Sequence, residues 1–382
     1  MKKDWFFCTT LFLIWRVLLF FVVGIGDLVL TYRPGFEYVH IWKFVAPYPP
    51  VSSVFFYPWA NFDGVHYLLI ASQGYTNNFG FFPLFPALIH LISLIFGKGS
   101  VFGLQQFFSA LVISNISIAL ALFLFYQLLL LDHGQSIARR TLVFLLLFPT
   151  SFFFGAIYSE SLFFLLLIAS FYCARKQKWL LSSVFGTLLT LTRSIGICVL
   201  PALLYEAWKQ KAINLKTVLS FLMIPWTFFG YAFFNWVATK NPLYFLEAHG
   251  NLANGRSVDT VVLIPQTIFR YIKIFLTLPI SQFEWWIALL ELVTFVFVSI
   301  LLYFAWRRRV RKSYLLFSLF AFLIPASSGT FTGIPRYSLV LFPIFISLTL
   351  VKNRSIRLAY LIISPILLFL LLMFFSKGYY VS

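Results

Sequence analysis

The sequence of 382 residues is poor in charged residues, which make up 10% of it, and acids are especially scarce, with 11 against 29 lysines and arginines. A soluble globular protein has about a quarter of its residues charged. Hydrophobic residues make up 61%. Apolar runs of about 20 residues recur along the chain, as spanning helices require. The composition excludes an ordinary soluble protein and indicates an all-α polytopic membrane protein.

Cysteine is also rare, with Cys8, Cys173 and Cys198 each inside an apolar run. Their spacing matches no metal-ligand or redox motif, so we interpret them as small buried residues and expect no metal and no cofactor. The sequence shows no internal repeat, low-complexity tract or linker. This pattern predicts a single domain over residues 1–382.

The excess of basic residues gives a net charge of +18. It does not indicate nucleic-acid binding, because these residues lie in short clusters between apolar runs, as in the cytoplasmic loops of membrane proteins. The clusters are at 2–3, 139–140, 175–178, 208–216, 307–311 and 352–357. If all six lie inside, an even number of crossings separates each cluster from the next.

This count predicts about eleven transmembrane helices, with the amino terminus inside and the carboxyl terminus outside. The expected spans are 6–30, 101–131, two within 139–174, two within 179–207, 217–238, 284–306, 313–325, 337–351 and 358–375. The run 79–97 is short and is interrupted by Pro83 and Pro86, so we expect an interfacial or re-entrant helix there. Residues 31–100 then form the first outer loop.

The same topology separates two kinds of charge. The outer side receives most of the acids and the solitary basic residues, whereas the inner side carries anchoring charge. The outer residues are Asp27, Glu37, Asp63, Glu160, Glu247, Asp259 and Glu284, with Arg193, Arg256, Arg270, Lys273 and Arg336. Such a mixture at one face is typical of a functional site.

Residues 61–72 are expected to form an amphipathic helix that ends at Gly74 and lies flat on the outer membrane surface. One face carries Phe62, Val65 and Leu69, and another carries Asp63, His66 and Tyr67. A partly desolvated, oriented carboxylate there could take a proton from a hydroxyl. The alternatives are a solvated aspartate and, for His66, a hydrogen-bonding residue at the headgroup level.

Two arginines stand alone near the outer side. Arg193 interrupts an apolar run, at a cost of about 3 kcal/mol on insertion scales, so a partner is expected. Arg193 and Arg336 could hold a lipid-linked phosphate, although Arg336 could instead reach toward headgroups. Glu160, beside Tyr158, could bond a sugar or cap the helix that follows.

The stretch "FDGVHYLLIASQGY" followed by "FGFFPLFPALI" resembles the PIG-V family, which comprises the second mannosyltransferase of GPI-anchor assembly and its prokaryotic relatives. "FPTSFFFGAIYSESLFFLL", "LTRSIG" and "RYSLVLFPIF" resemble later landmarks of this family in the same order. The resemblance implies the GT-C architecture, with two membrane-parallel helices after the first span. It places the catalytic acid on Asp63. The sequence departs from the family at Phe62, where Trp is frequent, and at Asn77 and Asn78, where an acid is frequent.

The resemblance implies a membrane mannosyltransferase that moves a sugar from a polyprenyl-phosphate donor to a lipid or glycan acceptor on the extracytoplasmic face, in the plasma membrane if the protein is prokaryotic. Asp63 would be the base, and Arg193 and Arg336 would hold the phosphate. The other expected substrate-binding residues are His66, Tyr67, Tyr158, Glu160 and Tyr337. A single base without a second carboxylate nucleophile favours inversion.

Two alternatives remain open. A flippase or transporter of a lipid-linked glycan would use the same arginines but would need no base. Transporters often show internal repeats, which this sequence lacks. A transferase of the same architecture could also use a different sugar.

Overall fold

The computed structural model describes residues 2–34, 54–97, 103–252, 257 and 260–381, which form α-helices and 3-10 helices and no strand. The all-α prediction is therefore confirmed for this part of the chain. Glu37, Arg256 and Asp259, which we expected on the outer side, lie outside the described residues.

Five helical segments of the described chain are long and apolar enough to cross a membrane. They are α1 (Lys2–Val29), α6 (Leu104–Leu129), α11 (Leu215–Phe221) with α12 (Met223–Thr239), α15 (Phe283–Arg307) and α19 (Arg354–Ser376). Each coincides with one expected span. These helices are candidate membrane spans by length and composition, and the total of eleven stays a prediction.

The other expected spans are shorter or interrupted helices. They are α7 (Gln135–Leu146), η4 (Ser151–Gly155) and α8 (Glu160–Arg175); α9 (Trp179–Thr190), η5 (Ser194–Cys198) and α10 (Val199–Lys209); α16 (Lys312–Ala326); and α17 (Ile334–Tyr337), η6 (Ser338–Val340) and α18 (Pro343–Thr349). The breaks at residues 150–159 and 338–342 are buried, whereas that at residues 191–195 is only partly buried. Non-helical backbone is tolerated at membrane depth where protein covers it or where it lines a water-filled cavity.

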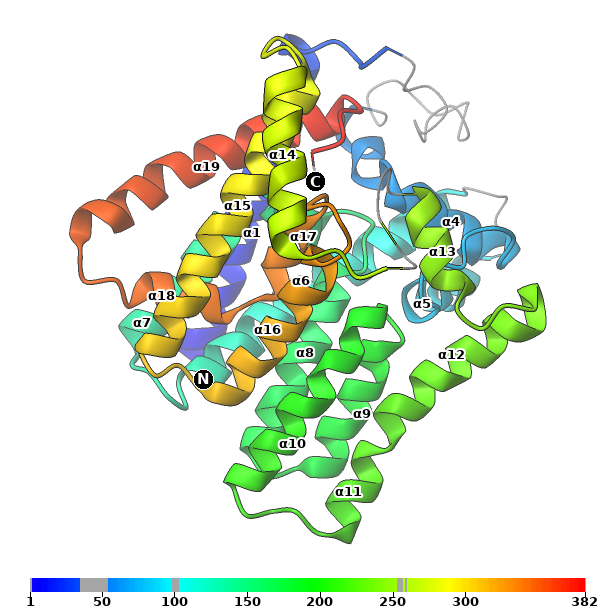
Figure 1. Cartoon of the computed structure of the whole chain (residues 1–382), viewed down its shortest axis with the longest axis vertical. Helices are drawn as coiled ribbons and strands as arrows, with labels where there is room; N and C mark the ends of the chain where they lie inside the picture. The colour runs from blue at the N-terminus through cyan, green and yellow to red at the C-terminus, as the bar shows by residue number, and fades with distance from the viewer. Residues whose placement is uncertain (1, 35–53, 98–102, 253–256, 258–259, 382) are drawn as a thin grey trace.

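The centre of the bundle is formed by α6 and α8, which pack along each other. Helix α9 packs on α8, and α1 packs on α19 and α6. In Figure 1, α9, α10, α11 and α12 extend from one side of this centre, whereas α15 and α19 cover another. Helices α4 and α5 lie beside α13, near the end of α12.

Within residues 31–100, which we expect to form the first outer loop, the described residues contain η2 (Tyr57–Ala60), α4 (Asp63–Gln73), α5 (Leu84–Ser93) and η3 (Leu94–Phe96). Helix α4 begins at Asp63 rather than Asn61, and it ends at Gly74, where φ is 77°. Val65 from one expected face and Tyr67 from the other are both buried in the protein core, so protein covers part of each face. Two helices after the first span are thus present, and their orientation parallel to the membrane stays a prediction.

Two helices were not predicted, α13 (Tyr244–Leu252) and α14 (Ile264–Thr277). Tyr271 of α14 donates a hydrogen bond to Glu291, which lies within the expected span 284–306. Its hydroxyl accepts one from the Phe331 N–H at 2.9 Å. This pairing joins α14 to α15 and to the segment before α17, which carries part of the site.

A second charge network, in which Glu206 is the only charged residue that is buried, lies at the opposite end of α8 from Glu160. Arg175 Nη2 donates to Asp132 Oδ1 at 2.8 Å, and Arg311 Nε donates to Glu206 Oε2 at 2.8 Å. Ser313 also donates to Glu206, at 2.6 Å. The 16 residues of α8 separate this network from Glu160 by about 24 Å. These charges, which we expected on the inner side, therefore tie helices together, which differs from the simple anchoring that we expected.

Candidate active site

The turn before α4 fixes the position of Asp63. Asn61 is buried, and its Nδ2 donates to the Phe375 carbonyl at 3.0 Å. The Tyr158 hydroxyl donates to the Asn61 carbonyl at 2.9 Å and accepts from the Asp63 N–H at 3.3 Å. Between them, Phe62 adopts a left-handed φ of 58°, which turns the chain into the helix. Asp63 is thus held at the amino end of α4, where the helix dipole favours a carboxylate.

Arg336 contacts Asp63 across 273 positions of sequence. It lies in the short helix α17, which Gly333 and Pro335 initiate. Its Nη1 donates to Asp63 Oδ2 at 2.6 Å, and its Nε lies 3.3 Å from Glu160 Oε1. The side chain is only 7% exposed, so both contacts form away from bulk water.

Glu160 contacts both Arg193 and Arg336. It begins α8, its side chain is 2% exposed, and its Oε1 accepts a hydrogen bond from Arg193 Nη1 as well as contacting Arg336. The Arg193 guanidinium lies 5.0 Å from the centre of the Tyr337 ring, and that of Arg336 lies 5.5 Å from the same ring. Asp63, Arg336, Glu160 and Arg193 thus form a four-charge cluster in which carboxylates and guanidiniums alternate.

The cluster sets the ionisation of Asp63. Burial would raise the pKa of this carboxyl, but Arg336, with His66 and Arg193, outweighs burial and holds the pKa below its usual range. Asp63 is therefore a carboxylate at neutral pH. While Arg336 holds it, it is also a weak proton acceptor.

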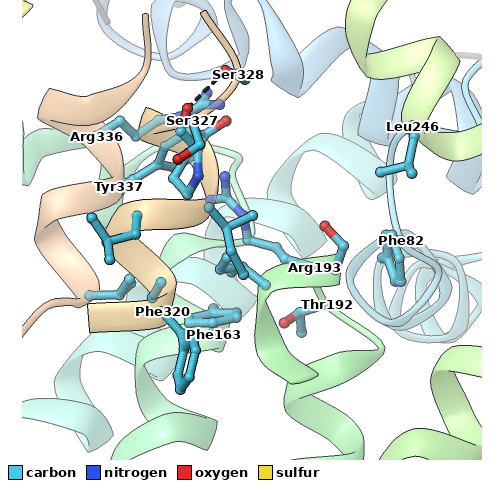
Figure 2. Close-up of a pocket in the computed structure, with 18 of the residues that line it drawn as sticks. Phe82, Phe163, Thr192, Arg193, Leu246, Phe320, Ser327, Ser328, Arg336 and Tyr337 are labelled. Carbon is cyan, nitrogen blue, oxygen red and sulfur yellow. Dashed lines mark hydrogen bonds between the residues drawn. The ribbon is translucent and has the colours of Figure 1, made fainter. Parts of the chain in front are cut away.

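The cluster opens on a cavity of about 620 Å³, a size that suits a small-molecule ligand. Its polar end is lined by Asp63, Tyr67, Arg193, Arg336 and Tyr337. In Figure 2 the Arg193 side chain extends toward Arg336 and Tyr337, while Phe163 and Phe320 lie at the opposite end. Apolar residues from α16 continue that end, and they include Leu323 and Ile324. The cavity thus joins a charged compartment to an apolar one.

All eight residues that the sequence analysis selected lie in this region, and five of them line the cavity. The other three, His66, Tyr158 and Glu160, do not line the cavity. His66 Nδ1 is 3.1 Å from Asn78 Oδ1, and its ring stacks on Phe81 at 4.9 Å. Among the described residues no three His, Cys, Asp or Glu side chains are grouped to hold a metal ion.

The sequence analysis missed Tyr380, which follows α19. Its ring packs edge-on against Phe62 at 5.3 Å, and it interacts electrostatically with Arg336 and Tyr158. Six serine and threonine residues of the cavity wall were also missed, Thr192, Ser194, Ser257, Thr260, Ser327 and Ser328. Nothing near Tyr380 in the sequence signals this role, because only the fold brings it to Asp63.

Together these features define a helical membrane protein with a charged cavity that adjoins an apolar compartment. Residues 49–224, just under half of the chain, match the family model described as Mannosyltransferase (PIG-V). This match supports membership of the PIG-V mannosyltransferase family and, with it, glycosyltransferase activity on a sugar donor and an acceptor. Asp63, Glu160 and Arg193 lie within the matched residues, whereas Arg336 and Tyr380 lie beyond them. No curated protein matches the chain.

Proposed function

We propose that the protein is a GT-C mannosyltransferase that moves mannose, with inversion, from a polyprenyl-phosphate donor to a lipid or glycan acceptor on the extracytoplasmic face. One observation carries this proposal. The same cavity is lined by an ionised acid, by two guanidiniums and by apolar side chains of α16. These are the groups that a lipid-phosphate sugar donor and a hydroxyl acceptor require.

The two ends of the cavity suit the two parts of such a donor. The fork geometry of Arg193 and Arg336 fits phosphate oxygens. At the apolar end, Phe320 and Ile324 line the cavity and are also 40% and 55% exposed on the outer surface of α16. A prenyl chain bound there would continue into the surrounding lipid.

The proposed reaction is a single displacement. Asp63 accepts the proton of the acceptor hydroxyl as its oxygen bonds to the anomeric carbon of the sugar. The bond from that carbon to the phosphate oxygen breaks, and the prenyl phosphate leaves with the electron pair. Arg193 and Arg336 stabilise the charge that develops on it. Asp63 is the only acid among the described residues that line the cavity, which favours inversion over a covalent intermediate.

The side of the membrane on which the site lies, and the choice of a transferase over a flippase, are both part of this proposal. The extracytoplasmic location rests on the basic clusters and on the separation of the four-charge cluster from the inner network. A flippase would use the arginines without a base, and it gives no reason to hold Asp63 in the cavity. A different donor sugar would need only a change in the hydroxyl groups of the wall.

The experiment that tests this function incubates the purified protein with radiolabelled prenyl-phosphate mannose and with membrane lipids as acceptors. We expect label to appear in a glycolipid, because the proposed reaction forms a glycosidic bond. Prenyl-phosphate glucose serves as the comparison donor. Movement of the intact donor between leaflets of a vesicle without a new glycosidic bond would indicate the flippase instead.

Tyr380→Phe is expected to lower the turnover of sugar transfer by about tenfold. The variant removes only the hydroxyl, and with it the electrostatic interaction with Arg336, while its ring still packs on Phe62. A tenfold loss corresponds to about 1.4 kcal/mol. Tyr379→Phe is the matched control, because Tyr379 packs on Phe283 and Phe374 instead. Equal turnover of both variants and the parent, at equal thermal stability, would show that Tyr380 only packs.

A further inference from the structure

In the structure Asp63 and Arg336 are paired with each other, although the proposed reaction needs each of them to interact with a different part of the substrates. Asp63 must be free to accept a proton, and Arg336 must be free to bind phosphate. In the structure their side chains are joined at 2.6 Å. The question is therefore which of the two changes partner when a donor enters.

The surroundings of Asp63 identify Arg336 as its principal partner. Besides the four charged residues, the titratable groups around the cluster are His66 and Tyr67 of α4, Tyr158, Tyr337 of α17 and Tyr380. Among the described residues, Arg336 alone forms an ion pair with the Asp63 carboxylate. Loss of that contact would leave the carboxylate without its strongest stabilisation.

The two carboxylates hold Arg336 from different sides. Asp63 lines the cavity and is 25% exposed, whereas Glu160 is 2% exposed and does not line it. A phosphate that enters the cavity therefore reaches Arg336 on the side of Asp63. Glu160 keeps its contacts with Arg193 and Arg336 behind them. Asp63 is the exchangeable partner, and Glu160 is a positioning residue.

We propose that the donor phosphate replaces Asp63 as the partner of Arg336, so that Asp63 becomes an effective base only after the donor has bound. This inference rests on the proposed function. The empty cluster holds two positive and two negative side chains, so it is neutral. The bound phosphodiester adds a negative charge beside Asp63, which strengthens the affinity of the carboxylate for a proton. No covalent step is involved, because only ionic contacts are exchanged.

A direct test measures the binding of farnesyl phosphate to the full-length protein in detergent. If Asp63 competes with phosphate for Arg336, Asp63→Asn removes the competitor. We expect its Kd for farnesyl phosphate to be about tenfold lower than that of the parent, which corresponds to about 1.4 kcal/mol. An unchanged or higher Kd would overturn the exchange of partners.

Glu284→Gln is the matched control for the change in charge. Glu284 pairs with Arg33 at 2.7 Å, its side chain is 52% exposed, and it does not line the cavity. Its Kd should equal that of the parent. An equal tightening by Glu284→Gln would mean that net charge, and not local competition, controls binding, and it would also overturn the proposal.

The pH dependence of transfer gives a second readout. The pKa of Asp63 is lowered in the empty site, so the active carboxylate persists toward lower pH, and kcat/KM for the donor reports this state. In the donor complex the pKa should be higher, so kcat should begin to fall at a higher pH than kcat/KM does. If kcat and kcat/KM for the donor began to fall at the same pH, the inference would be contradicted.

Failure of the proposed function gives a different result from failure of this inference. If no prenyl-phosphate sugar is transferred but Asp63→Asn binds farnesyl phosphate more tightly, the partner exchange stands and the enzyme assignment fails. If transfer occurs and binding does not tighten, the assignment stands and the exchange fails.

Discussion

Asp63→Asn is expected to lower the rate of sugar transfer by about a hundred- to ten-thousandfold, the usual loss when a general base is removed. The amide keeps the size of the side chain and can still bond at the amino end of α4. It cannot accept the proton of the acceptor hydroxyl. The measurement is kcat at saturating donor and acceptor, with thermal unfolding recorded for the same preparation.

His66→Ala is the comparison for this variant. His66 lies one helical turn from Asp63, but its ring contacts Asn78 and Phe81 and does not line the cavity. Its loss should therefore reduce transfer much less than the loss of the Asp63 carboxylate. Near-parental turnover by Asp63→Asn would exclude Asp63 as the base.

Arg336→Ala is expected to affect both the stability and the donor affinity. Removing one partner of a buried ion pair costs about 3–5 kcal/mol, because the remaining charge stays buried, and here Glu160 would retain only Arg193. Arg336→Lys keeps the charge but loses the fork that fits phosphate. Thermal unfolding and the KM for the donor would measure the two effects separately.

The order of the Arg336 variants is informative. We expect Arg336→Lys to raise the donor KM with a moderate loss of stability. We expect Arg336→Ala to raise the donor KM further and to lower the Tm. Arg33→Ala is the control, because Arg33 forms an exposed pair with Glu284 away from the cavity. Full activity in a folded Arg336→Ala protein would contradict a phosphate-binding role.

The long helices could be predicted from the sequence, and several shorter elements could not. A membrane requires about 20 apolar residues for a crossing, so α1, α6, α15 and α19 follow from composition alone. The interrupted segments depend on tertiary packing, which buries the breaks at residues 150–159 and 338–342. Residues 337–351 look like one span but form η6 and α18, because Pro343 starts a new helix inside the protein.

The charged residues of the site could also be selected from the sequence, since ionisable groups in an apolar chain are costly and rarely kept without a role. Their pairing could not. The sequence analysis left Glu160 either to bond a sugar or to cap the following helix, whereas the structure places it at the start of α8, between Arg193 and Arg336. Tyr380 could not be selected, because tyrosine is common and 317 positions separate it from Asp63 (380 − 63). The pairing of Glu160 and the position of Tyr380 both depend on contacts between residues that are far apart in the sequence.

The four-charge cluster also has a consequence for biosynthesis. Asp63, Glu160 and Arg193 emerge from the ribosome well before Arg336. Until α17 is in place, two acids share one arginine, and the cluster carries an excess negative charge in a region of low dielectric constant. Insertion of α17 late in synthesis neutralises that charge. The final helices thus complete the folding of the first ones, and a nascent chain stalled before Arg336 is expected to be a substrate for membrane quality control.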